Sequence, residues 1–447
     1  MYTPDLVWEP APGLEEALAQ QAIERGLVVV AGAGISAAEP TGLPSGGGTA
    51  ELLVERLHLL GKEQLVAHCD PRDLLCVADA IEAQAGGGDL LQGMLRQAAA
   101  WLTATPDFGH KALAVLVAEG LVHLVLTNWD DCVERSLQLS PRINAVINDA
   151  DRAHVTPPRV LKVHGCATRY GSLLATTGAL EEPPTWAFHE LGASLGTAPV
   201  VFIGVGSLAS YTRQRVVQVV AAVPEPEWIY VVARTIGDDW HEIIPALGED
   251  HVAEQDADAF LDSLLRAVVR MVFMIAREKA TAMGDEATAG IESVAQGLGF
   301  LGALDVVMWF RASLVEWPPA TRGLTGAEGM RALLALCMLS SGAPVDFVAP
   351  AALVLDQHLY CVLLSRNAHA YDVIKQSQAR AAQLAAQGLV RAGDSLKAVS
   401  IGHIGAFRGG GAPRDIVAEA EPDSVVDGPL GTTIEYISGD ALVAEVA

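Results

Sequence analysis

The chain has 447 residues, 51% of them hydrophobic and 19% charged, which excludes general disorder and provides enough material for two domains. Its formal net charge of −25 makes direct binding to nucleic acid or anionic lipid unfavourable. The start of the chain has no basic segment followed by an apolar run, and the apolar stretch 261–276 is too short to span a bilayer. We therefore expect a cytoplasmic protein with no signal peptide and no membrane segment.

The first predicted elements are a helix at 12–25 and a strand that leads into a glycine-rich turn. Leu27–Val30 is an uninterrupted apolar run, typical of a strand buried on both faces of a parallel sheet. The turn 32–36 follows at once, and its glycines allow a phosphate to approach the backbone amides while Ser36 adds a hydroxyl. This pattern predicts a phosphate-binding turn at the end of the first strand.

Helices and strands then alternate to about residue 250. Ser45 and the three glycines after it predict an exposed, mobile loop before a helix that starts near Thr49. Further helices are predicted as a pair within 71–102 and at 108–120, 186–195 and 211–222. Strands are predicted at 121–127, 145–147, 160–163, 200–203 and 228–232. Such alternation predicts an α/β fold with a doubly wound parallel sheet, whose ligands bind beyond the carboxyl ends of the strands.

Polar residues and a second glycine turn follow several of these strands. Asn128 and Asp130 come after the second strand, His164 after a later one, and the turn 204–207 after the strand at 200–203. Asn128 could instead cap the next helix, and His164 could be a surface histidine. His110 opens a helix far from any strand end, so we interpret it as structural.

Six cysteines, at positions 69, 76, 132, 166, 337 and 361, lie far apart and form no Cys-x-x-Cys pair. This spacing argues against a structural zinc site and favours reduced thiols. No metal is therefore expected.

Four segments, taken in order, resemble the sirtuin (SIR2) superfamily. They are GAGIS at 32–36 with GLP at 42–44, the run 105–131 that ends in TNWDD, LKVHG at 161–165, and FIGVGSL at 202–208. The resemblance covers about residues 20–250. It implies a Rossmann-like sheet that binds NAD and an activity that breaks the bond between nicotinamide and ribose.

The resemblance also implies roles for individual residues. Asn128 would orient the nicotinamide ribose and an attacking water, His164 would act as general base, and Asp130 would support the nicotinamide pocket. The other implied NAD-binding residues are Gly32, Ala33, Gly34 and Ser36 at the pyrophosphate, Pro44 in the GLP segment, and Gly204, Gly206 and Ser207 near the adenosine. An amide and an imidazole suit these catalytic roles, because glycosidic cleavage needs a positioned water and a base that accepts a proton near neutral pH.

Two departures distinguish this chain from the deacylating sirtuins. No paired cysteines follow Cys166, where a four-cysteine zinc module is expected, and SGGG follows GLP in place of Phe-Arg. The pattern is similar to SIR2-like effectors of bacterial antiviral defence, which hydrolyse NAD. Our leading hypothesis is therefore an NAD glycohydrolase activated by a partner or by assembly. The alternatives are an NAD-dependent protein deacylase without zinc and a non-enzymatic sensor of NAD or ADP-ribose.

We expect a catalytic domain at 1–255 and a second, mainly helical domain at 256–447. Helices are predicted at 256–283, within 286–316 with a turn at 317–319, and at 326–340, with helical character to Leu389. Beyond Gly393 the sequence predicts a short α+β or β segment with a loop at 409–413. The apolar helices predict a homo-oligomer. A protein partner or phage-derived trigger is expected to act through this domain.

Overall fold

The computed structural model describes residues 13–139, 141–182, 184–299, 301–314, 323–340, 342–349, 352–355, 357–364, 370–401 and 425–437. The chain divides into two compact units, with the boundary between Leu265 and Arg266. The turn predicted at 317–319 and the loop predicted at 409–413 lie outside the described residues.

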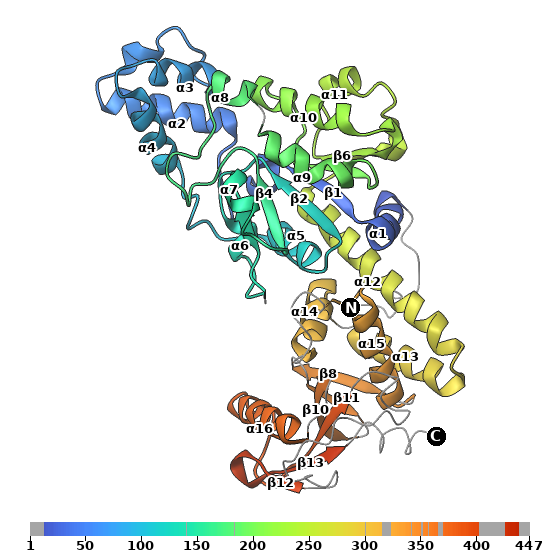
Figure 1. The fold of residues 1–447 in the computed structure, drawn as a ribbon. Helices are drawn as coiled ribbons and strands as arrows, with labels where there is room; N and C mark the ends of the chain where they lie inside the picture. The colour runs from blue at the N-terminus through green and yellow to red at the C-terminus, as the bar shows by residue number, and fades with distance from the viewer. Residues whose placement is uncertain are drawn as a thin grey trace. The chain divides into compact units, whose positions relative to one another are not determined.

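The first unit is built on a seven-stranded sheet with the order β3-β4-β2-β1-β5-β6-β7, in which every neighbouring pair is parallel (Figure 1). The strands are β1 Leu27–Ala31, β2 Val122–Leu126, β3 Asn144–Val146, β4 Arg159–Lys162, β5 Val200–Ile203, β6 Ile229–Ala233 and β7 Val252–Glu254. The predicted doubly wound α/β fold is confirmed. Only the short strand β7 was not anticipated.

Helices cover both faces of this sheet. On one face, α9 Thr185–Leu195, α10 Ser210–Ala222 and α11 Asp238–Ile243 pack on Val28, Val30 and Phe202. The other face is covered by α1 Leu14–Arg25, which contacts β1, and α5 Phe108–Ala118, which contacts β2. The central strand β1 is buried along its whole length, as its apolar sequence predicts.

A separate helical module (residues 46–98) is formed by α2 Gly46–Leu59, η3 Glu63–Val66, α3 Leu74–Glu82 and α4 Gly87–Ala98 (Figure 1). Its apolar cluster includes Trp129 and Leu173, from loops that follow β2 and β4. The exposed loop predicted at Ser45 and the three glycines is wrong, because Gly46–Gly48 form the first turn of α2. The Ser45 hydroxyl caps that turn by accepting the Gly48 amide at 3.2 Å.

The remaining short elements of the first unit are η2 Ala33–Ser36, α6 Cys132–Arg135, α7 Asp149–Arg152, α8 Thr177–Glu181, η4 Pro226–Trp228 and η5 Glu249–His251. They connect the larger helices and strands.

The second unit combines helices with a mixed sheet. Its helices are α12 Ala257–Thr281, within which the unit boundary falls, α13 Asp285–Leu298, α14 Ala303–Ser313, α15 Ala327–Ser340 and α16 Ala370–Ala386. Its six-stranded sheet has the order β12-β13-β11-β10-β9-β8. The strands are β8 Val345–Ala349, β9 Ala352–Leu355, β10 His358–Leu364, β11 Ser395–Ile401, β12 Val425–Asp427 and β13 Thr433–Ile437, with η8 Pro429–Gly431 between the last two.

Strands β8, β9 and β10 correct the prediction that helical character continues to Leu389. Their apolar runs are short, and neighbouring strands supply their backbone hydrogen bonds, antiparallel among β8, β9 and β10 and parallel between β10 and β11. Periodicity alone does not separate such a run from a piece of buried helix.

The cysteines also require a correction. Cys69 and Cys76 form a disulfide in the middle of the helical module, contrary to the expectation of reduced thiols. The turn between η3 and α3 brings the two side chains together despite their separation of seven residues. The other cysteines, Cys132, Cys166, Cys337 and Cys361, are free and buried.

Among the described residues, no single helix is long and apolar enough to cross a membrane, and only the bent pair α13 and α14 meets those criteria jointly.

Candidate functional site

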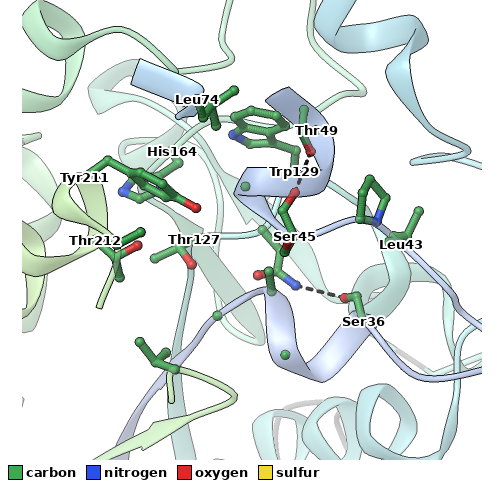
Figure 2. Close-up of a pocket in the computed structure, with 18 of the residues that line it drawn as sticks. Ser36, Leu43, Ser45, Thr49, Leu74, Thr127, Trp129, His164, Tyr211 and Thr212 are labelled. Carbon is green, nitrogen blue, oxygen red and sulfur yellow. Dashed lines mark hydrogen bonds between the residues drawn. The ribbon is translucent and has the colours of Figure 1, made fainter. Parts of the chain in front are cut away.

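A cavity opens at the carboxyl edge of the first sheet, between the two glycine turns and the helical module (Figure 2). Parallel sheets place ligands at this edge, where the strand order reverses between β1 and β5. All eleven residues predicted for the site line the cavity: Gly32, Ala33, Gly34, Ser36, Pro44, Asn128, Asp130, His164, Gly204, Gly206 and Ser207. The structure thus brings together residues from four separate segments of the chain.

The two glycine turns are in direct contact at the floor of the cavity. Gly34 donates its amide to the Gly204 carbonyl at 3.0 Å. A Cβ atom on Gly34 would lie 2.6 Å from that carbonyl oxygen, and one on Gly204 would lie 2.7 Å from the Ile35 nitrogen. Gly204 also has a φ of +69°, which strongly favours glycine. Both turns therefore need glycine to approach each other.

Asn128 follows β2 and is buried, with its side chain inside the cavity wall. Its Nδ2 donates to the Ser36 hydroxyl at 2.8 Å (Figure 2). It does not cap the next helix, because α6 begins at Cys132, whose amide donates to the Asp130 carboxylate at 3.0 Å. The capping alternative for Asn128 is therefore wrong.

His164 follows β4 and is only 4% exposed, so it is not a surface histidine. Its ring donates a hydrogen bond to the Thr127 carbonyl, and its Nε2 has no partner within the described chain. Burial, and then the nearby charge of Arg215, lowers the pKa of His164 to about 3. The imidazole is therefore neutral at physiological pH, with a bare nitrogen available as an acceptor.

Three buried polar atoms of cavity-lining residues have no hydrogen-bond partner in the described structure: Asn128 Oδ1, Trp129 Nε1 and His164 Nε2. We call these atoms the recognition set. Buried polar atoms are nearly always paired, so an unpaired group of them in a cavity indicates where a ligand or water binds. The set offers two acceptors and one donor.

Asp130 is held beneath the cavity by a buried lysine. Lys162 is fully buried on β4, pairs with Glu134 at 3.3 Å and donates to the Asp130 carbonyl. Burial opposes ionisation of Asp130, but the charges of Lys162 and His110 hold its pKa below the usual value. Asp130 is therefore a carboxylate that accepts hydrogen bonds at both oxygens.

Sequence reasoning missed several residues of this site. Trp129 stands between two predicted site residues, and that position was the only signal for it. Tyr211 reaches the cavity from α10, where Figure 2 shows it with Thr212 on the side opposite Ser36 and Leu43. No local pattern marks a helix residue of this kind.

His110 also requires a correction, because it is not remote from the site. Its Nε2 lies 3.0 Å from the Ser36 hydroxyl, directly behind the cavity wall. The position of His110 at the start of α5 gave no indication of this contact.

Two groups of side chains have the spacing of a metal site within the described residues. In the first, His68 neighbours Cys69 and Cys76, whose sulfurs are already joined in the disulfide. In the second, His110 and Asp130 lie near Cys132. Burial raises the pKa of the Cys132 thiol, which disfavours the thiolate that a metal requires. The absence of a metal remains a prediction.

No protein-family model matches the chain. No curated protein matches it either. Among solved structures, the chain is similar to a crystal structure of a SIR2 homolog in complex with NAD, with 17% identity and a TM-score of 0.34, over 57% of this chain and 94% of that chain. The fold and the cavity define an α/β protein with a cavity at the switch point of a doubly wound parallel sheet.

Proposed function

We propose that this protein binds NAD at the carboxyl edge of its first sheet and hydrolyses it to nicotinamide and ADP-ribose. The observation that carries the proposal is the recognition set, with an unpaired amide oxygen and an unpaired imidazole nitrogen on two buried residues that line one cavity. The sirtuin-like motifs of the sequence fall at the same place and support the same ligand.

The two acceptors have the chemistry that glycoside hydrolysis needs. Asn128 Oδ1 accepts a hydrogen bond from a ribose hydroxyl or from the attacking water and so fixes its position. His164 Nε2 takes the proton that this water loses as it adds to the oxocarbenium-like carbon. Its low pKa makes it a weak base in the free protein. The negative pyrophosphate of NAD would oppose the charge of Arg215 and raise that pKa on binding.

Trp129 supplies the donor of the set. Its indole nitrogen is buried, and the residue lines the cavity next to Asn128, where we place the group attached to the ribose. Trp101 packs against its ring edge to face at a centroid distance of 5.6 Å, and Leu74 adds an apolar wall. An apolar slot with one N–H donor fits a flat base with a carbonyl group, as in nicotinamide.

The glycine turns suit the other end of the ligand. Both turns line the cavity, and Ser207 and Thr212 place hydroxyl groups near them. Parallel sheets bind phosphate groups at strand-to-loop turns whose backbone amides a ligand can approach closely. We therefore place the pyrophosphate over these turns.

The experiment that tests this proposal is chromatography of NAD incubated with the purified full-length protein. Nicotinamide and ADP-ribose in equal amounts support hydrolysis. Binding of NAD without turnover would contradict hydrolysis and indicate a sensor. An O-acyl-ADP-ribose product formed from an acetylated peptide would indicate a deacylase.

The proposal extends to an antiviral effector that is activated by a partner or by self-assembly through residues 256–447. This part rests on the sequence resemblance and on the apolar helices of the second unit. A homo-oligomer is expected, and light scattering at micromolar concentration tests it. A monomeric mass with full NAD turnover would contradict activation by assembly.

A further inference from the structure

The Ser36 hydroxyl is the centre of a buried group of side chains behind the cavity. Three side chains approach its Oγ: Asn128 Nδ2 at 2.8 Å, His110 Nε2 at 3.0 Å and Asp130 Oδ2 at 3.1 Å. Asp107 Oδ1 lies 2.5 Å from the other ring nitrogen of His110, Nδ1. We call these five residues the Ser36 network. All of them are buried.

A count of protons fixes the direction of these hydrogen bonds. A hydroxyl has one proton to donate and two lone pairs to accept with. The charge of Lys162 and the hydrogen bond from the Cys132 amide favour the ionised form of Asp130, whose Oδ2 therefore accepts the Ser36 proton. The other two partners must therefore donate to Ser36: Asn128 through Nδ2, and His110 through Nε2.

The same count fixes the protonation of His110. Its Nδ1 faces the Asp107 carboxylate and donates to it, while its Nε2 donates to Ser36. Both ring nitrogens then carry a proton, and the ring is a cation. Three carboxyl groups lie around it: Asp107 at the cap of its own helix, Asp130 beyond β2 and Asp258 on α12. The neutral Cys132 thiol, Arg135 beside that thiol and Lys162 behind Asp130 are the other titratable groups described there.

We propose that His110, protonated on both ring nitrogens and held by Asp107, is a positioning residue that acts through Ser36 to set the Asn128 amide with its oxygen facing the cavity. A neutral His110 with its proton on Nδ1 would compete with Asp130 for the single Ser36 proton. Asn128 could then turn its amide over, and its oxygen would no longer face the ligand. For its link to catalysis, this inference rests on the proposed function.

The direct test is nitrogen NMR of the wild-type protein with labelled histidine at neutral pH, using His110→Gln to assign the signal. We expect a directly bonded proton on both ring nitrogens of His110. A bare Nε2 would overturn the inference. This readout is independent of the reaction, so failure here is distinguishable from failure of the proposed NAD hydrolysis.

Kinetics test the positioning role. His110→Ala should lower kcat for NAD hydrolysis by about 100-fold with little change in KM, because misplacement of a catalytic group acts on the transition state. His110→Gln retains an N–H that can reach Ser36 and should recover about ten-fold of that loss. Equal losses in both variants, matched by equal falls in Tm, would show a merely structural role.

Asp107 offers a second variant that is free of a capping artefact. Its carboxylate caps α5 by accepting the His110 amide at 3.1 Å, and asparagine caps helices about as well as aspartate. Asp107→Asn therefore removes the charge and keeps the cap, and it should lower kcat by about ten-fold or more. The matched control is Asp73→Asn at the cap of α3, which should leave kcat unchanged. Equal kcat values for the two variants would overturn the role of Asp107.

Discussion

Two groups of buried polar atoms at the cavity, the Ser36 network and the recognition set, differ in whether they have hydrogen-bond partners. In the Ser36 network hydrogen bonds run without a break from Asn128 Nδ2 through Ser36 and His110 to Asp107. The recognition set, by contrast, has no partner among the described residues. Paired buried groups hold a structure, whereas unpaired ones are costly unless a ligand completes them. Asn128 belongs to both groups, because its Nδ2 takes part in the Ser36 network and its Oδ1 is in the recognition set. The same amide therefore links the structural network to the proposed ligand contacts.

The greatest loss should come from separating the two glycine turns at the floor of the cavity. Gly34→Ala would place a Cβ atom 2.6 Å from the Gly204 carbonyl oxygen, which forces the turns apart. We expect loss of more than about 100-fold in kcat/KM for NAD and a lower Tm. The matched control is Gly192→Ala in helix α9, where nothing lies within 4 Å of the added atom. This control variant should be slightly more stable than the wild type. Comparable losses of kcat/KM in both variants would contradict the need for close contact between the two glycine turns.

A smaller effect is expected for the two tryptophans that line the cavity, Trp129 and Trp101, because their N–H groups differ in hydrogen bonding. Trp129→Phe removes an unpaired N–H, so it should weaken NAD binding by about ten-fold while Tm barely changes. Trp101→Phe removes an N–H that donates to the Leu95 carbonyl at 2.8 Å, so it should lower stability by about 1 kcal/mol. Calorimetric binding and thermal unfolding check both variants. Equal affinity for NAD in wild type and Trp129→Phe would remove Trp129 from the recognition set.

The last prediction concerns the pH dependence of stability, where the change per pH unit is small. The pKa of His164 is about 3 in the folded protein and near the ordinary histidine value of about 6.5 when unfolded. Between these values the unfolded chain binds a proton that the folded chain does not. Stability is therefore lost as pH falls through this window. Replacing His164 by Asn should remove about 1 kcal/mol per pH unit from the slope of unfolding free energy between about pH 6 and pH 4. Urea titrations in which both proteins show the same slope would contradict a buried, neutral His164.

The fold of the first unit and the location of its cavity could be predicted because their signals are local. A buried β-branched run and a glycine turn are contiguous in sequence, and the strand ends of a parallel sheet necessarily share one edge. The contact of Ser36 with His110 joins residues 74 positions apart, and only packing decides it. The unpaired Trp129 N–H could not be predicted from the sequence either, because whether this group finds a hydrogen-bond partner depends on every side chain packed around it.

The second unit shows the same limit on a larger scale. The helices α12 and α15 follow amphipathic or apolar runs long enough to be recognised. Strands β8 and β9 are short, and their hydrogen bonds come from each other and from β10. The Cys69–Cys76 disulfide likewise depends on a turn geometry that cysteine spacing did not reveal.

The most direct test of the central claim is NAD consumption by the purified wild-type protein beside Asn128→Ala and His164→Ala, with the products separated by chromatography. We predict equal amounts of nicotinamide and ADP-ribose from the wild type and a loss of about 100-fold or more in each variant. Folding of the variants is checked by Tm. Turnover at the wild-type rate in both folded variants would contradict the assignment of the recognition set as the site of hydrolysis.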